Sequence, residues 1–377
     1  MSRSLREFLK YRFAFAFPGA TAPAELAKGN KVGWGSRLRR VSLCFVSLAA
    51  LCGPALLSPA PVAACDICAI YTAVDLGPSR SGFRIGVAEQ YTMFDTRMED
   101  SVEVSNPGER MQGSITQFMV GYGFGPSLGL QLNLPVIYRP YTRLEDGALV
   151  SGSESGIGDM AILGRYVPYR YVSERGLFRL TLFGGLKFPT GNSEPLSEEK
   201  PEDFRDLFRR KAGVASVDPL ASVSHAESAS AIHGHDLALG TGSYDGVVGG
   251  QVFGSWDRFF LTGEVQYTLR TEGSYNYQYA NDLTFRGGPG YFLYLQHSWL
   301  VGLQGVVSGE TKGQDTLDGE ALDDTAATYV FAGPALRVGI GTNFSMEIIG
   351  DIPFIRHETS LQIVPNYRIR GGIVWRF

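Results

Sequence analysis

Two groups of residues in this sequence could bind a metal ion or form a covalent bond. Cys65 and Cys68 are separated by two residues. This spacing is compatible with a disulfide or redox pair and with metal binding, and the small residues before Cys65 resemble a lipoprotein signal that would lead to lipidation of that cysteine. Ala69 follows Cys68, so the histidine that a c-type haem site requires is missing. The three interpretations of the pair stay open.

The second group is His225, His233 and His235, with Asp236 adjacent. Imidazole and carboxylate groups so close in sequence could bind Zn²⁺ or Cu²⁺. The alternative is a polar loop, rich in Ser and Ala, in which the histidines are incidental. We favour this alternative because a disordered loop would supply no further groups to orient the imidazoles.

Catalysis and nucleic-acid binding have little support in the sequence. A hydrolase needs a serine and a histidine within hydrogen-bond reach, but His297 is expected in a short turn and His357 in a loop, neither beside an obvious serine. No glycine-rich loop of the kind that holds phosphates follows a strand and opens a helix. The formal net charge of -4 provides no basic surface for nucleic acid. We therefore expect no enzyme, no cofactor and no nucleic-acid partner.

Alternation of apolar and polar residues is the dominant pattern of the chain. Apolar residues occupy nearly every second position in 128–138, 177–188, 259–270 and 367–377, whereas an amphipathic helix would repeat every 3.6 residues. Each stretch has roughly the nine to eleven residues that a tilted strand needs to cross a bilayer. The pattern predicts strands with one face toward lipid and the other toward a polar interior.

The predicted fold is all-β, a transmembrane antiparallel up-and-down β-barrel of about twelve strands. A soluble sandwich also alternates, but here short connections alternate with long ones, and a closed sheet leaves no unpaired edge in the bilayer. Long connections are expected near 95–110, 139–155, 189–241, 271–281 and 309–325, with 189–241 as the long extracellular loop. Predicted strands begin near Gly82, Gln112, Leu128, Gly158, Leu177, Ser243, Arg258, Leu283, Trp299, Ala327, Phe344 and Ile363.

Two positions in the first and last strands have particular meaning. Glu89 falls on the apolar face of the first strand, which a bulge or a short first strand would explain. The last strand ends at Phe377, and a terminal aromatic residue resembles the signal that outer-membrane proteins present to the barrel insertion machinery. We therefore expect the barrel in the outer membrane of a Gram-negative bacterium, surrounded by its lipid.

Charged residues on the inward faces of the strands are the candidate functional residues of the lumen. Such walls can set the selectivity of a channel. Opposite charges could instead pair across a narrow lumen and plug it, and both interpretations remain open. The predicted lumen charges are Asp159, Arg165, Arg179, Lys187, Glu264, Arg270, Glu347, Asp351, Arg368, Arg370 and Arg376.

Residues 1–64 have the pattern of an extended n-region followed by a secretory signal peptide. Basic residues at 37–40 precede an apolar run that Gly53 and Pro54 interrupt. About a dozen uninterrupted apolar residues remain, too few for a membrane-spanning helix of roughly twenty. Residues 65–80 would then form a periplasmic N-terminal segment, and residues 81–377 the barrel.

Several short glycine-rich motifs resemble a known family. The segments 156–166 (GIGDMAILGRY), 185–191 (GLKFPTG) and 351–353 (DIP), with the glycine-rich stretch 240–256, are similar to outer-membrane transporters of the "MetA-pathway of phenol degradation" family. The resemblance implies a barrel that passes small, hydrophobic or aromatic compounds. It implies no catalytic residues.

Taken together, these patterns predict a passive channel or transporter for a small-molecule solute. The second interpretation is a structural barrel that docks a periplasmic partner near Cys65 and Cys68. A barrel enzyme is the weakest of the three.

Overall fold

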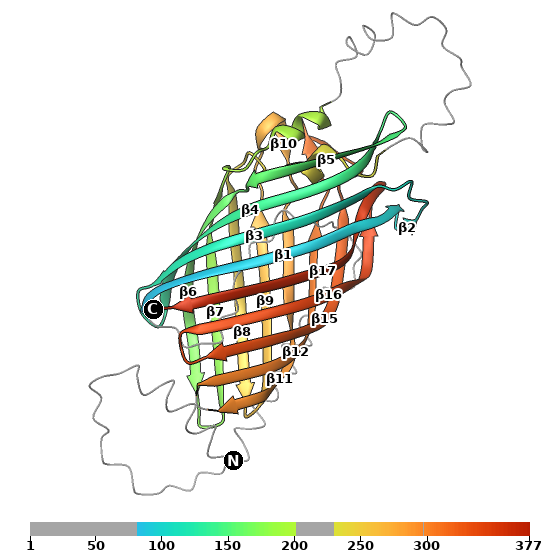
Figure 1. Cartoon of the computed structure of the whole chain (residues 1–377). Coiled ribbons are helices and arrows are strands. Elements are labelled where there is room, and N and C mark those ends of the chain that lie inside the picture. The colour runs from blue at the N-terminus through green and yellow to red at the C-terminus, as the bar shows by residue number, and fades with distance from the viewer. Residues whose placement is uncertain (1–80, 201–229, 297) are drawn as a thin grey trace, which may run out of the picture. The chain divides into compact units, whose positions relative to one another are not determined.

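The computed structural model describes residues 81–200, 230–296 and 298–377, and among these residues a single large sheet closes into a barrel (Figure 1). The sheet has 14 strands. The short β2 (Val102–Glu103) and β5 (Ala148–Ile157) are lateral additions, so the ring itself has 12. Its strands are β1 (Gly82–Glu99), β3 (Arg110–Gly123), β4 (Leu128–Glu145), β6 (Met160–Val172), β7 (Gly176–Phe188), β8 (Asp245–Trp256), β9 (Phe259–Leu269), β11 (Asp282–Gln296), β12 (Trp299–Lys312), β15 (Ala327–Ile340), β16 (Phe344–Glu358) and β17 (Leu361–Arg376). The predicted fold is confirmed.

The ring is closed by its first and last strands. β1 pairs antiparallel with β17 from Arg84 opposite Arg376 to Glu99 opposite Leu361. On its other side β1 pairs with β3, so both edges of the sheet are hydrogen-bonded. This pairing is what a bilayer requires, since lipid offers no partner for an exposed backbone N–H or C=O.

The predicted loop 139–155 is wrong. β4 continues to Glu145 and forms a hairpin with β5, which pairs with residues 136–145. Asp146 and Gly147 make the turn with φ of 49° and 78°, the left-handed values that a two-residue hairpin turn requires and that Asp-Gly readily adopts. β5 leads into β6, so the two act as one long neighbour of β4.

Small elements gather at the end of the barrel that carries the long connections (Figure 1). β10, β13 and β14 form a separate three-stranded sheet. No helix in the described part of the chain is long and apolar enough to cross a membrane. The small elements at this end of the barrel are η2 (Glu194–Glu199), α4 (Gly234–Leu237), η4 (Ser274–Asn276), β10 (Tyr277–Gln278), β13 (Thr316–Leu317) and β14 (Glu320–Ala321).

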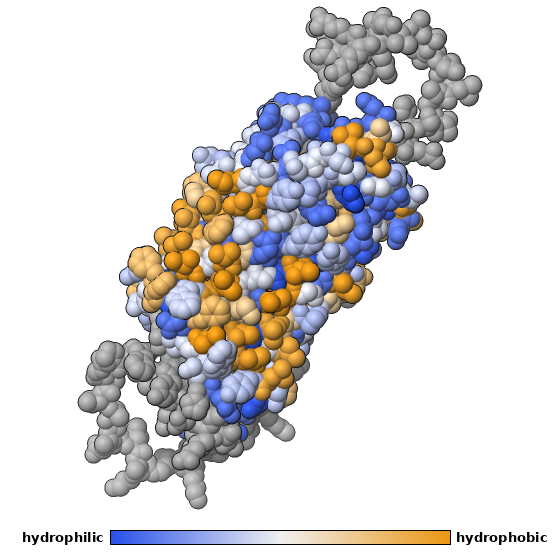
Figure 2. Space-filling view, viewed as in Figure 1, coloured by the Kyte–Doolittle hydropathy of each residue, from blue (hydrophilic) through white to orange (hydrophobic). Residues whose placement is uncertain are grey.

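The outward positions of the strands form an apolar belt. On β4, for example, Leu130, Leu132 and Val136 are exposed while Gly129, Asn133 and Ile137 between them are buried. Figure 2 shows hydrophobic side chains gathered over the barrel wall, with mainly hydrophilic ones at the end that carries the long connections. An exposed apolar surface of this extent is typical of a barrel that is surrounded by lipid.

Aromatic side chains make contacts where the strands meet the short turns. Phe83 lies 4.8 Å from Tyr122, and Phe259 lies 5.0 Å from Tyr291, measured between ring centroids. Phe377 contacts Trp375 at 6.5 Å. Rings at this level form one of the two aromatic girdles that membrane barrels place at the lipid–water boundary.

Glu89 keeps its outward position, so the expectation of a bulge or a short first strand is wrong. β1 has 18 residues, and its register shifts against β17 occur beyond Glu89, after Met93. The carboxylate instead accepts hydrogen bonds from Ser114 at 2.7 Å and Thr116 at 2.5 Å on β3. Two hydroxyl donors thus replace part of the hydration that the carboxylate would lose to lipid.

Candidate functional site

The interior of the barrel is lined by polar side chains because the inward positions of the alternating strands are polar. The structure places all the predicted lumen charges in the interior, with their side chains buried or half-buried. They fall at different heights. Arg165, Arg179 and Arg376 lie toward the short turns, Glu264, Glu347, Asp351, Arg368 and Arg370 lie in the middle, and Asp159, Lys187 and Arg270 lie toward the long connections.

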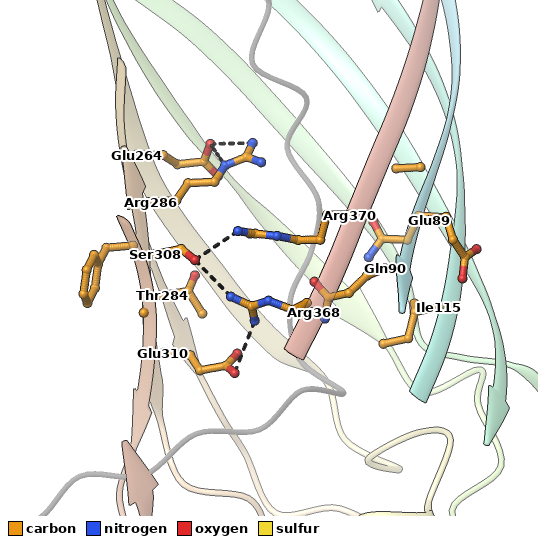
Figure 3. A pocket seen from close by; sticks show the side chains of 14 residues that line it. Glu89, Gln90, Ile115, Glu264, Thr284, Arg286, Ser308, Glu310, Arg368 and Arg370 are labelled. Atoms are coloured by element: carbon orange, nitrogen blue, oxygen red, sulfur yellow. Dashed lines mark hydrogen bonds and ion pairs between the residues drawn. The ribbon is translucent and has the colours of Figure 1, made fainter. Parts of the chain in front are cut away.

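A cluster of charges spans the middle of the lumen. Arg368 and Arg370 of β17 each donate a hydrogen bond of 3.0 Å to Ser308 of β12 (Figure 3). β15 and β16 separate these strands in the sheet, so the contacts cross the interior. Arg370 also pairs with Asp351, and Arg368 lies 3.4 Å from Glu310. Opposite charges therefore pair across the lumen and narrow it.

A second set of ion pairs lies beside this cluster. Arg286 of β11 contacts Glu264 at 3.2 Å and Glu347 at 3.4 Å. Arg337 of β15 contacts the same Glu347 at 2.6 Å. One carboxylate therefore holds two guanidinium groups.

Glu347→Gln is expected to lower the free energy of unfolding by up to about 3–5 kcal/mol, because it leaves two buried guanidinium groups without their shared counter-charge. Urea unfolding of the barrel in liposomes measures the change. Glu145→Gln is the matched control, since Glu145 is 42% exposed in its pair with Arg143, and we expect it to change stability by less than about 1 kcal/mol. Equal effects of the two substitutions would contradict a role for Glu347 in joining the pairs.

A cavity lies beside the charged cluster in the middle of the lumen. It encloses about 660 Å³ of space free of atoms, part of it open to solvent. Glu264, Arg286 and Glu310 of β9, β11 and β12 line one side, and Arg368 and Arg370 of β17, with Ala88, Gln90, Ile115 and Gln117 of the neighbouring β1 and β3, line the other. Figure 3 shows Glu89 pointing away from this cavity. The cavity therefore has charged groups on both sides, with apolar contact from Ala88 and Ile115 on one of them.

Toward the long connections a chain of buried ion pairs runs along the wall. Lys187 lies 2.7 Å from both Asp159 and Asp245. Arg270 lies 2.8 Å from Asp245 and 2.5 Å from Asp282. Every charge in this chain has an opposite neighbour, as burial demands.

Asp159 also forms hydrogen bonds with both ends of the long connection between β7 and β8. It accepts hydrogen bonds from the backbone N–H of Gly191 at 3.0 Å and of Thr241 at 2.9 Å. Nearby, the N–H groups of Leu239 and Gly240 donate to the carbonyl of Asn192. The connection therefore leaves and re-enters the wall at the same place.

The described parts of this connection, residues 191–200 and 230–241, form a plug in the mouth of the barrel. Leu239 is buried against Ile115 and Ile137, inward residues of β3 and β4. Ile232 packs in a cluster with Met111 and other inward residues of the ring. Polar contacts add to this packing, since Glu109 accepts hydrogen bonds from Ser230 and Ala231, and Arg139 donates to the carbonyl of Asp236.

The plug brings His233 and His235 together. Their rings are stacked with centroids 5.4 Å apart. His235 is buried, and its Nδ1 lies 2.9 Å from Glu199. Burial opposes the charged form of each group, but the contact with His235 lowers the pKa of Glu199 to about 2, and the charges of Asp236 and Glu199 raise the pKa of His235 to about 10. The cluster therefore favours a positive charge among carboxylates.

His357 departs from the sequence-based expectation. It lies in β16 rather than in a loop, and its Nδ1 is 3.3 Å from the hydroxyl of Ser101. That hydroxyl is also 3.3 Å from the carbonyl of Glu358, to which it can donate. Both side chains are exposed, and no carboxylate contact to the other imidazole nitrogen is seen in the described residues. A serine therefore does lie beside this histidine, without the third group that orients a catalytic imidazole.

Several lumen residues were not predicted. Arg286, Arg337 and Asp282 are inward charges on strands that were correctly placed, so carrying the alternation through each strand would have found them. Glu199 and Asp324 were missed because their contacts to the histidines are long-range. Residues 1–80, 201–229 and 297 lie outside the described part of the chain, and with them the predicted signal peptide (1–64), the segment 65–80, Cys65, Cys68, His225 and His297.

Comparisons with known proteins bear on the fold. No family model and no curated protein matches the chain. Among solved structures, the COG4313 outer membrane channel from Pseudomonas putida F1 is similar at a TM-score of 0.56 and 14% identity, over 82% of this chain and 100% of that one. The fold is that of an outer-membrane β-barrel.

More distant similarity extends to other outer-membrane barrels. The translocator domain of the autotransporter NalP from Neisseria meningitidis matches at a TM-score of 0.34 and 12% identity, over 79% of this chain and 89% of that one. The toluene transporter TodX from P. putida matches at a TM-score of 0.34 and 8% identity, over 78% and 90%.

Proposed function

We propose that this barrel lies in the bacterial outer membrane and lets a small solute diffuse through its interior. The observation that carries the proposal is the polar, partly open cavity at mid-height in a ring whose outer face is apolar. Inward charges at such a constriction act on whatever passes it. The plug would then act as the gate at the mouth.

The walls of the cavity support a solute with an apolar body and a polar group. Ala88 and Ile115 provide apolar contact, while Arg368 and Arg370 on the neighbouring β17 provide donors. Small aromatic compounds with a hydroxyl or carboxyl group have this character. The resemblance of segments 156–166 and 185–191 to the "MetA-pathway of phenol degradation" family points to the same class.

Gln117→Trp is expected to reduce solute permeation several-fold, because the indole would fill the cavity that Gln117 lines. Liposome swelling with a panel of small aromatic acids and sugars measures permeation. Phe118→Trp is the matched control, since Phe118 is the outward neighbour and 45% exposed. Permeation that is equal in the two variants would mean that solutes do not pass this cavity.

The anchoring role and the enzyme predict different results in the same experiments. A barrel that only anchors a periplasmic partner would remain silent to every solute after correct insertion, even when the plug is removed. A barrel enzyme would turn over glycerophospholipid and lose this activity on Ser101→Ala. Either outcome would contradict the proposed channel function and favour the corresponding alternative.

A further inference from the structure

The strongest unassigned feature of the molecule is the side-chain cluster of the plug. The nitrogen or oxygen ligand atoms of His233, His235 and Asp236 all lie within 4.8 Å of one another. Asp236 is central, with one oxygen 3.9 Å from His233 Nδ1 and the other 3.6 Å from His235 Nε2. Ligands of a tetrahedral Zn²⁺ at about 2.0–2.2 Å from the metal lie roughly 3.3 Å apart. Small side-chain movements would therefore complete the set.

A different carboxylate lies on the far side of each imidazole. Glu199 lies 2.9 Å from His235 Nδ1, and Asp324 lies 3.6 Å from His233 Nε2. The remaining nitrogen of each ring faces Asp236. A carboxylate on one imidazole nitrogen, which fixes the ring so that the other nitrogen can bind, is the usual arrangement around protein-bound metals.

The backbone reinforces this orientation. Glu199 also accepts a hydrogen bond of 2.7 Å from the N–H of His235, so one carboxylate positions both the main chain and the ring. Tyr279 donates to the carbonyl of the same residue at 2.9 Å. His235 is thus fixed on several sides before any ligand binds.

An unsatisfied atom points into the cluster. Nδ1 of His233 is buried and has no hydrogen-bond partner among the described residues. Leaving a buried polar atom without a partner is unfavourable, because the atom loses its hydrogen bonds to water and gains none in return. A bound cation would give this nitrogen a partner.

The charges around the cluster also favour a cation. Three carboxylates, Glu199, Asp236 and Asp324, surround the two imidazoles. The neighbouring Lys312 is already paired with Asp315 at 2.8 Å. A polar cavity beside His235 and Asp236, lined by Arg139, Thr92 and Glu310, opens on the lumen side and has room for water as a further ligand.

We propose that His233, His235 and Asp236 bind one divalent transition-metal ion, with water from the lumen side as the fourth ligand and with Glu199 and Asp324 as positioning residues. Two imidazoles, a carboxylate and water suit Zn²⁺, and they also accept Cu²⁺ or Ni²⁺. The ion would fix the turn of residues 233–236, which Glu199 and Asp324 already contact. This proposal does not depend on solute transport.

Calorimetric titration of Zn²⁺ into the full chain, refolded in detergent and stripped of metal with EDTA, tests the proposal. We expect one Zn²⁺ per chain, and loss of this binding in His233→Ala and in Asp236→Asn. Glu199→Gln, which removes only an orienting charge, should weaken the affinity by about 10–100-fold. Heat-modifiable migration on a gel shows that each variant still forms the barrel.

Two other histidines provide the controls. His357→Ala removes an exposed imidazole on β16, and His225→Ala removes the third histidine of the sequence-based set. Neither should change the isotherm. Visible absorption of bound Co²⁺ provides a second readout, which should show tetrahedral coordination in the wild type and lose it in His233→Ala. A flat wild-type isotherm, or one that His233→Ala and Asp236→Asn leave unchanged, would overturn the proposal.

Discussion

Removing the plug is expected to raise the single-channel conductance several-fold. The variant excises residues 192–239 and joins Gly191 to Gly240 through two glycines. Two glycines are enough because the two ends of the excised segment lie side by side: the carbonyl of Asn192 accepts hydrogen bonds from the N–H groups of Leu239 and Gly240. The hydrogen bonds of Asp159 to Gly191 and Thr241 can be kept, so the wall should remain intact. Planar-bilayer recordings at fixed salt measure the change.

A point variant separates occlusion by the plug from a general effect of the deletion. Leu239→Asn places a polar amide in the apolar cluster of Ile115 and Ile137. It should loosen the plug and raise the open probability without opening the barrel wall. Leu149→Asn is the control, because Leu149 is 47% exposed on the β4–β5 hairpin. If the deletion variant inserts correctly and conducts like the wild type, the plug does not limit passage.

An arginine on the outer face should prevent or weaken insertion, whereas an arginine one position away should not. Leu132→Arg places a guanidinium in the apolar belt between Val120 and Ile162. The cost of such a charge is about 2–4 kcal/mol at the bilayer midplane. Folding into liposomes across a urea series, followed by heat-modifiable gel migration, measures this loss.

Gln131→Arg is the matched control for that experiment. Gln131 points inward on the same strand and donates a hydrogen bond to Asn133. An arginine there meets a polar interior, where its guanidinium can replace the amide as the donor to Asn133, and it should cost less than about 1 kcal/mol. If the two variants fold equally well, the assignment of inner and outer faces on β4 is wrong.

The strands were predictable because the alternation of apolar and polar residues can be recognised within each short stretch of sequence, without knowledge of the strand's neighbours. All the predicted strand starts lie within a few residues of the observed ones, from β1 at Gly82 to β17 at Leu361. The β4–β5 hairpin was not predicted, although Asp146 and Gly147 are a typical two-residue hairpin turn. The turn residues alone would have favoured a hairpin over the long connection expected at 139–155.

The plug and its histidine cluster were only partly predictable. The sequence identified His233, His235 and Asp236 as possible ligands, but it favoured an incidental role on the ground that a loop supplies no orienting groups. Glu199 and Asp324 supply them, from positions that no sequence spacing connects to the histidines. Which charges pair across the lumen, such as Arg368 with Glu310, depends in the same way on the closure of the ring.

The pairing of β1 with β17 also determines the order of events when the protein is made. β1 can find its second partner only after β17 has been synthesised, so until the ring closes the edge of β1 is unsatisfied and can aggregate. The pairing of β1 with β17 joins residues that are far apart in the sequence. The loss of chain entropy that this closure requires comes before the contacts between the two strands can compensate for it. Closure of the ring therefore has to wait for β17, and the edges of the sheet need protection until then.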